Sequence, residues 1–435
     1  MKLSSRSDSY IIPEYSLTGD LLSFLTCNLQ YRFLNKGTLP PSKPIQLWFG
    51  EFIHGVMEEA YLKWEIKKTS FPWDWKKDIR PIEEMIDLRL RARGLYPPTD
   101  LFCPFRKDSS SEEYEYIEIG KCGDNNHPHK LLASARAESA INVWGPDLFP
   151  LIDSAEVLIK GNRNMPNFKE NCSRSNYYGI NGVIDVISSM NINNSSSNEL
   201  LKYLSENKEI TDLFENQEVK DVSKNQEVKD ISENQKIKDL FENQNNTNNL
   251  DTIDCEEYEI IIDYKGMKRP SIDSSNWKRH KWQILTYAWL RSLQAESKPV
   301  AAGIIFYLNE LVPSTEDLIA IKNDIILDNS DIDLESKDKK ALSEWDENED
   351  DYLQLSDLSK KNRSIRIIPI KEKSISKALN EFDKVVSNIE KSIISEINGE
   401  LIQNAWQANA DKRTCDACDF KYFCHKQNLK DLKIP

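Results

Sequence analysis

The sequence has no run of eighteen apolar residues, and its first residues, MKLSSRSDSYIIPEYSLTGD, lack the apolar block of a secretory signal. These two absences argue against a membrane span and predict a soluble, cytoplasmic protein with no membrane partner. In that compartment thiols stay reduced, and clustered cysteines bind metal more often than they form disulfides.

Also missing is the GxxxxGK[ST] signature of a helicase motor, and the sequence shows no Ser-His-Asp or Cys-His arrangement of a nucleophilic hydrolase. The 435 residues are nonetheless enough for one large domain with insertions, or for two to three ordinary domains. If the protein works with a motor, we expect that motor on another chain.

An excess of positive charge is lacking too, since the formal net charge is −14. The acidic residues are unevenly placed: residues 191–254 carry 14 against 7 lysines, and residues 316–358 carry 15 against 4. The two segments together hold −18 of the charge, which leaves about +4 for the rest of the chain. A locally basic groove is therefore compatible with the acidic total.

Residues 206–250 contain a nine-residue repeat, ENKEITDLF, ENQEVKDVS, KNQEVKDIS, ENQKIKDLF and ENQNNTNNL. Nine is not a helical heptad, and each unit has few apolar residues with which to offset its ordering entropy. We therefore expect residues 191–252 to be a disordered insertion without catalytic residues. The alternative is a short array of amphipathic helices.

The remaining patterns predict helices followed by a sheet. Residues 1–150 are expected to be mostly helical, with apolar positions at three- and four-residue intervals. Runs of β-branched residues predict core strands within 151–190 and 253–310, where NWKRHKWQILTYAWLRSL adds a helix. Residues 311–362 are expected to form an acidic loop, and 363–435 a final strand, a long helix and a cluster of three cysteines.

Charged residues interrupt two of the predicted strands. Asp263 and Lys265 follow three isoleucines in IIIDYKG and share one side of the strand, because strand side chains alternate. An ion pair at the strand end would explain these two residues by themselves. Asp185, however, lies inside the apolar run GVIDVI, a position that disfavours a carboxylate. Two carboxylates on neighbouring strands make the hard oxygen site that Mg²⁺ or Mn²⁺ prefers.

Two predicted helices carry further polar groups. His54 lies in the apolar pattern GEFIHGVMEEAY, where a lone histidine is commonly a satisfied core residue. His280, Gln283 and Tyr287 can share one helix face, because they are three and four residues apart. Basic residues near the strand end and the helix start predict a phosphate-binding rim, formed by Lys268, Arg269, Lys278 and Arg279.

The order of these motifs, a histidine in a helix, then GVID, then DYK, then QxxxY, resembles the RecB-like branch of the PD-(D/E)XK nuclease superfamily. The chain is similar in this to CRISPR-associated RecB-like exonucleases and to AddB-type nuclease domains. The resemblance implies a fold of the α/β (α+β) class, with a restriction-endonuclease-like core whose mixed central sheet is flanked by helices. It also implies a helical N-terminal region and a C-terminal iron–sulfur clasp.

The same resemblance implies roles for the site residues. His54, Asp185 and Asp263 would bind one or two divalent cations, Mg²⁺ or Mn²⁺, with the backbone carbonyl of Tyr264 as a further ligand. Lys265 would position or activate the attacking water and complete a catalytic set with Asp185 and Asp263. The implied reaction is metal-assisted phosphodiester hydrolysis. The DNA-binding and supporting residues would be Gln283, Tyr287, His280, Lys268, Arg269, Lys278 and Arg279.

Three of the eight cysteines fall in the segment CDACDFKYFC. Cys415, Cys418 and Cys424 make an incomplete ligand set. The resemblance implies that Cys27, far upstream, is the fourth ligand of a structural [4Fe–4S] cluster. Zinc also accepts four thiolates, and the spacing alone leaves it open as the less favoured alternative.

The implied function is that of a Mg²⁺- or Mn²⁺-dependent deoxyribonuclease, an exonuclease on single strands or DNA ends in repair, recombination or defence. Its partners would be DNA and a separate helicase subunit. The competing interpretation is a catalytically silent DNA-end-binding subunit of a helicase–nuclease complex. An iron–sulfur electron carrier is a third interpretation, which the complete set of nuclease motifs does not favour.

Overall fold

The computed structural model of the protein describes residues 12–36, 45–97, 128–169, 173–191, 198–210, 257–327, 330–332, 334–346 and 353–424. The statements below concern these residues. Within these ranges, no helix is both long enough and apolar enough to cross a membrane.

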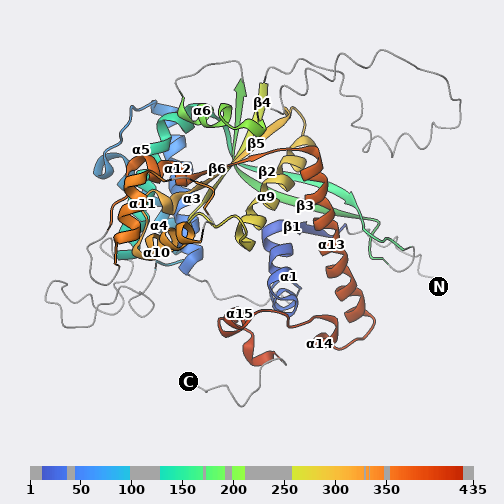
Figure 1. The fold of residues 1–435 in the computed structure, drawn as a ribbon. Coiled ribbons are helices and arrows are strands. Elements are labelled where there is room, and N and C mark those ends of the chain that lie inside the picture. Colours follow the sequence, from blue (N-terminus) through green and yellow to red (C-terminus); the bar gives the residue numbers. More distant parts are fainter. Residues whose placement is uncertain are drawn as a thin grey trace, which may run out of the picture.

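A six-stranded mixed sheet forms the centre of the molecule (Figure 1). Its strands are β1 (Glu14–Ser16), β2 (Ile152–Asn164), β3 (Tyr177–Asn191), β4 (Glu257–Lys265), β5 (Val300–Tyr307) and β6 (Ile365–Pro369). The order is β1-β3-β4-β5-β6, with β2 paired to β3 beside this path. β3 is antiparallel to β2 and β4 and parallel to β1, while β5 is parallel to β4 and antiparallel to β6. The predicted mixed sheet is confirmed.

The strands β3 and β4 lie on either side of the predicted insertion in the sequence, and they are neighbours in the sheet. Ile260, Ile261 and Ile262 of β4 are all completely buried. Alternate isoleucines enter the apolar clusters on opposite faces of the sheet. The continuous apolar run before Asp263 is therefore explained by a strand that is covered on both faces.

Four helices cover one face of the sheet (Figure 1): α3 (Ile45–Lys67), α4 (Arg80–Ala92), α5 (Pro128–Leu148) and α6 (Glu199–Ser205). On α3 the residues Phe52, Val56 and Ala60 repeat at four-residue intervals and are completely buried. This apolar stripe holds α3 against the sheet and brings His54, on the same helix, close to the strand ends.

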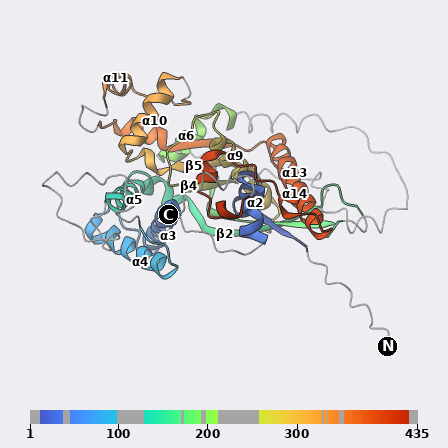
Figure 2. The same ribbon diagram turned by 90° about the horizontal axis from the view of Figure 1, so that it is seen from below.

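The other face is covered by helices from the two ends of the chain and by one central helix (Figures 1 and 2). They are α1 (Ser23–Thr26), α2 (Asn28–Tyr31), α9 (Ser275–Ser292), α13 (Glu372–Ile397), α14 (Ile402–Ala405) and α15 (Lys412–Asp416). The backbone N–H of Leu29 donates to the carbonyl of Gln407 at 3.2 Å. The N-terminal helices and the C-terminal segment are thus joined directly.

The described residues of the expected acidic loop, 311–362, are largely helical. They contain α10 (Thr315–Ile326), α11 (Ser336–Glu344) and α12 (Asp357–Ser364), which pack around a small apolar cluster of their own. Acidic residues here have structural roles: Asp317 forms a capping box with Ser314 and binds Arg136 at 2.6 Å. The prediction was wrong for these residues because the acidic content concealed apolar residues at helical spacing. The most acidic part, residues 347–352, lies outside the described residues, as do 328–329 and 333.

The expected disordered insertion, 191–252, begins with ordered structure. Asn198 caps α6, and Leu200 and Leu204 of that helix are completely buried. Ile210, in the first repeat unit, is also buried. The prediction was wrong for residues 198–210, because ELLKYLS places two leucines on one helix face. Residues 211–252 lie outside the described residues.

Candidate active site

Asp185 lies on β3 where the pairing between β3 and β4 stops. The last pair of that ladder joins Val186 and Ile262. Beyond it, the backbone N–H of Tyr264 donates to Oδ2 of Asp185 at 2.8 Å. The Asp185 carboxylate thus bridges the two strands at the position where they separate.

The helix α3 brings His54 to the same position. His54 Nδ1 lies 3.3 Å from Asp185 Oδ2, and the imidazole is edge-on to the ring of Tyr264. One ligand atom of each of His54, Glu156 and Asp185 lies within 4.8 Å of the others. We call these three residues the metal-ligand group, because imidazole nitrogen and carboxylate oxygen are ligands that Mg²⁺ or Mn²⁺ can share.

Glu156 is a site residue that the sequence analysis missed. It lies on β2 between Ala155 and Val157, whose partners in β3 are the two residues that flank Asp185. Its φ angle is +51°, in the left-handed region that few residues other than glycine adopt. This backbone conformation places the Glu156 carboxylate beside Asp185. The only sequence signal was an acidic residue in the strand-like run AEVLIKG.

The carboxylates of the metal-ligand group are electrostatically unfavourable to one another. Burial, opposed by the His54 imidazole and reinforced by Asp263, raises the pKa of Asp185. Glu156 is exposed as a residue, but partial burial of its carboxylate, together with Asp185 and Glu58, raises its pKa to about 7. Groups that resist ionising side by side are suited to a bound cation, which favours their charged forms.

Asp263, Lys265 and Gln283 form a connected set next to Asp185. Lys265 Nζ lies 2.6 Å from Asp263 Oδ2 and donates to Gln283 Oε1 at 3.0 Å. Gln283 Nε2 donates to Asp263 Oδ1 at 3.1 Å and lies 3.3 Å from the hydroxyl oxygen of Tyr287. Four of the predicted residues are therefore in contact, and Gln283 fixes the orientation of both the carboxylate and the ammonium.

The close approach of α9 to β3 depends on Gly182. A Cβ atom at this position would lie 2.5 Å from the ring of Tyr287. The glycine in GINGVID therefore allows Tyr287 to pack directly on the strand that carries Asp185. This contact sets the position of the QxxxY helix relative to the metal-ligand group.

The predicted phosphate-binding rim is divided in the structure. Lys268 and Lys278 are exposed and Arg279 is half-buried, so all three have the solvent-accessible surface that contact with a phosphate requires. Arg269 is instead 4 % exposed, with its guanidinium bound to Asp331 at 2.6 Å. Arg269 is thus internal and does not belong to a surface for DNA, because its charge is already neutralised.

His280 does not face outward either. Its Nδ1 lies 3.0 Å from the hydroxyl of Tyr307. Burial, followed by the nearby ammonium of Lys265, lowers the pKa of His280 to about 4. The imidazole is therefore neutral at physiological pH and supports the core beneath Lys265.

The structure also brings the four predicted cysteines together. Cys27 is buried, and Cys415 and Cys424 pack against the same apolar cluster. Burial, followed by the thiols of Cys27 and Cys424, raises the pKa of Cys418. None of these four described cysteines is joined in a disulfide. Cysteines nearly 400 residues apart in the sequence thus converge where the ends of the chain meet.

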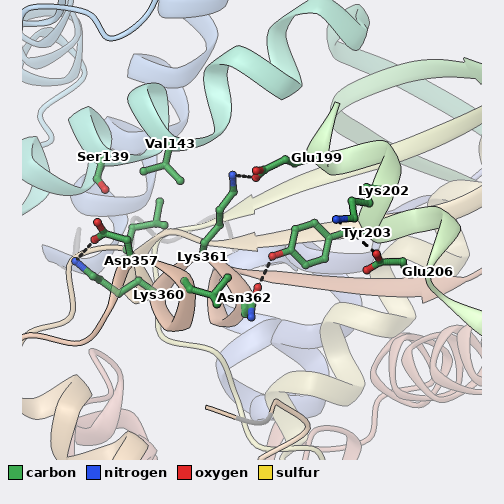
Figure 3. Close-up of a pocket in the computed structure, with 12 residues that line it drawn as sticks. Ser139, Val143, Glu199, Lys202, Tyr203, Glu206, Asp357, Lys360, Lys361 and Asn362 are labelled. Carbon is green, nitrogen blue, oxygen red and sulfur yellow. Dashed lines mark hydrogen bonds and ion pairs between the residues drawn. The ribbon is translucent and has the colours of Figure 1, made fainter. Parts of the chain in front are cut away.

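A cavity of about 560 Å³ lies elsewhere, between α5, α6 and α12 (Figure 3). Its charged side chains are occupied with one another: Lys361 pairs with Glu199, and Lys360 with Asp357. None of the residues of the metal-ligand group lines it. The candidate active site therefore lies outside this cavity.

At the ends of the sheet strands, the Asp263–Lys265 ion pair thus lies close to an imidazole and two carboxylates that could hold a cation. The family model described as the PD-(D/E)XK nuclease superfamily matches residues 247–425. This segment contains Asp263, Lys265, the QxxxY helix and the cysteine cluster. No curated protein was found to match the chain.

The match agrees with the superfamily part of the sequence interpretation over these residues, which make up less than half of the chain. Nucleases of this superfamily typically hydrolyse phosphodiester bonds with divalent metal ions, and a nucleic-acid substrate follows from that activity. His54, Glu156 and Asp185 precede the matched segment, and only the fold brings them to it. The RecB-like branch, the iron–sulfur cluster and the individual residue roles stay predictions.

Proposed function

We propose that the protein is a metal-dependent DNA nuclease of the RecB-like type, which acts on single strands or DNA ends. One observation carries the proposal: the metal-ligand group lies beside the Asp263–Lys265 pair of the matched segment. Neither part would be sufficient alone. Together they supply cation ligands and a positioned ammonium within one site.

The site residues have different roles in the proposed reaction. His54, Glu156, Asp185 and Asp263 would hold a divalent cation, which would supply Lewis-acid activation of water and neutralise charge on the scissile phosphate. Lys265 presents its ammonium to the phosphate and the attacking water. Asp263 and Gln283 hold that ammonium by contacts of 2.6 and 3.0 Å, so it needs no reorganisation during the reaction.

Basic side chains that are exposed or half-buried support the nucleic-acid part of the proposal. Lys268 lies shortly after the end of β4, and Lys278 and Arg279 lie in the first turns of α9. Positive groups at this distance along the chain from Lys265 can neutralise phosphates of a bound strand. We propose these three residues as the DNA-binding rim.

We further propose that Cys27, Cys415, Cys418 and Cys424 bind a structural [4Fe–4S] cluster. The support is that burial raises the pKa of Cys418 and that the thiols of Cys27 and Cys424 lie close enough to raise it further, at the place where Cys415 and Cys424 pack against the apolar cluster that contains Cys27. Thiolates are the expected ligands of such a cluster. Zinc, which also accepts four thiolates, is the alternative that metal analysis of the purified protein distinguishes.

The nuclease proposal is tested with anaerobically purified protein and end-labelled single- and double-stranded DNA. Cleavage is expected in Mg²⁺ or Mn²⁺ and is expected to stop on chelation. Asp185→Asn should reduce the rate by about a hundredfold or more. Asp153→Asn, an exposed carboxylate on the same strand as Glu156, should have no effect. Absence of cleavage on every substrate, or full activity of Asp185→Asn, would show that the proposal is wrong.

A further inference from the structure

An exposed pair of apolar side chains lies next to the metal-ligand group. Leu158 of β2 and Val183 of β3 are direct partners in the antiparallel ladder. Leu158 is 62 % exposed and Val183 is 39 % exposed. We call these two residues the apolar pair. Neither residue belongs to the apolar clusters of the described residues, and neither has a role in the proposed chemistry.

The apolar pair lies on the same side of β3 as the candidate site. Val183 and Asp185 are separated by Ile184, which is buried in the cluster beneath α9. Because side chains alternate along a strand, Val183 and Asp185 both lie opposite Ile184. Two residues along a strand correspond to about 6.6 Å. Val183 of the apolar pair is therefore the next side chain after Asp185 on this face of β3.

From Val183 toward Asn181 of β3, the ladder of β2 and β3 is covered by other elements on only one of its two faces. On that face, side chains of α9 pack against Gly161 and Gly182, where even a Cβ would be too close. On the other face the next pair is Lys160 with Asn181, and Lys160 is exposed. The open face thus carries an acidic metal-ligand group, then the apolar pair, then the ammonium of Lys160 beside Asn181, whose amide donates to Glu14 at 3.2 Å.

We propose that the apolar pair receives the unpaired nucleotide next to the scissile phosphate. This inference rests on the proposed nuclease function and adds to it the side chains that would contact the base of a single strand. A nucleotide has an apolar base face and a sugar next to charged phosphates. On the open face of the sheet, the apolar pair is likewise followed by the ammonium of Lys160. Base faces are accessible in a single strand but stacked inside a duplex. The apolar pair therefore favours a single strand at the site.

The test uses a single-stranded oligonucleotide and versions that carry one abasic position, moved stepwise along the strand. Binding is measured by fluorescence anisotropy in Mn²⁺, in a Lys265→Ala background so that the strand stays intact. Losing the base at one position should weaken binding about fivefold, equivalent to about 1 kcal/mol of apolar contact. Leu158→Ser with Val183→Ser should weaken binding of the normal strand by about the same factor.

The decisive comparison combines the two changes. In the Leu158→Ser, Val183→Ser protein the abasic position should no longer matter, because the contact is already lost. Leu88→Ser, which removes an exposed leucine of α4, is the matched control and should behave as the parent protein. The melting temperatures of all variants are compared to confirm that they fold.

The proposal is wrong if the abasic position has no effect anywhere, or if its effect persists in the double variant. It is also wrong if the double variant changes only the oligomeric state, since the apolar pair would then be a protein interface. These outcomes are separate from the nuclease proposal. A protein that cleaves DNA without any effect at the apolar pair refutes this inference alone, and an abasic effect without cleavage refutes only the nuclease proposal.

Discussion

At the scale of single residues, the site depends on carboxylates that are unfavourable together without a cation. Burial and the charge of neighbouring acids raise the pKa values of Asp185 and Glu156. Glu156 also holds a left-handed backbone conformation, which costs on the order of 1 kcal/mol or more. A residue kept in that conformation beside another acid is explained if its carboxylate contributes to cation binding.

Glu156→Gln should therefore weaken binding of Mn²⁺ by about tenfold while leaving the fold intact. The measurement is isothermal titration calorimetry with the full-length protein. Glu58→Gln is the control, because it removes a nearby carboxylate of α3 that lies outside the metal-ligand group. Equal Mn²⁺ affinity in Glu156→Gln and wild type would show that Glu156 is not a ligand.

The residues that the sequence revealed are those whose chemistry conflicts with their surroundings. Asp185 and Asp263 are charged groups in apolar strands, so sequence alone marked them. Glu156 was hidden because an acidic residue in an exposed strand position is ordinary, and its φ angle depends on the folded sheet. The sequence wrongly placed Arg269 in the phosphate-binding rim, because the sequence does not reveal which basic residues the fold buries.

At the scale of elements, ion pairs with buried arginines attach the helices α10 to α12 to the sheet. Asp331, in the connection after α10, binds Arg269 at 2.6 Å and accepts a bond from Arg366 Nε at 2.8 Å. Burial alone would raise the pKa of Asp331, but these guanidinium groups lower it well below its ordinary value. The sequence did not predict this unit, because its stability comes from partners distant in the chain.

Asp331→Asn should lower the free energy of unfolding by about 3 kcal/mol at pH 6, because two buried guanidinium groups lose their counter-charge. The pKa of Asp331 is lower in the folded than in the unfolded chain, where it is about 3.9. Its stabilisation is therefore complete above about pH 5 and is lost as the pH falls. Urea unfolding at pH 6 and pH 3 should show that the variant and wild type differ less at pH 3.

The control for this prediction is Asp273→Asn, an exposed carboxylate between β4 and α9. It should change the stability by less than about 0.5 kcal/mol at either pH. A difference between Asp331→Asn and wild type that stays constant or grows toward pH 3 would contradict the assigned role of Asp331.

At the scale of the whole molecule, the two ends of the described chain close around the sheet. Asn28 and Leu29 are hydrogen bonded to the segment after α14. Arg32 donates to Glu396 of α13 at 3.2 Å, and Glu396 also accepts a bond from Trp406. The proposed iron–sulfur cluster would add a covalent link to these contacts. The sequence predicted the partner of the three-cysteine segment only through the family resemblance.

Cys418→Ser should therefore lower the melting temperature of anaerobically purified protein by several degrees and remove absorbance near ~400 nm. DNA binding should weaken before the cleavage chemistry is affected, since the cysteines are remote in sequence from Asp263 and Lys265. Cys424→Ser should behave alike, because both thiols would be ligands. A colourless wild type that contains zinc would contradict the cluster, and an unchanged melting temperature in Cys418→Ser would contradict its structural role.

Lys265 is the residue on which the proposed catalysis depends most, so the single-turnover rate of DNA cleavage by Lys265→Ala at saturating Mg²⁺ tests the proposed function. We expect a rate at least about a hundredfold below that of wild type, with Mn²⁺ affinity retained, because the ammonium acts on the phosphate and does not bind the cation. Lys384→Ala, an exposed lysine of α13, should cleave as wild type does. A Lys265→Ala protein that cleaves at the wild-type rate would contradict the role proposed for Lys265.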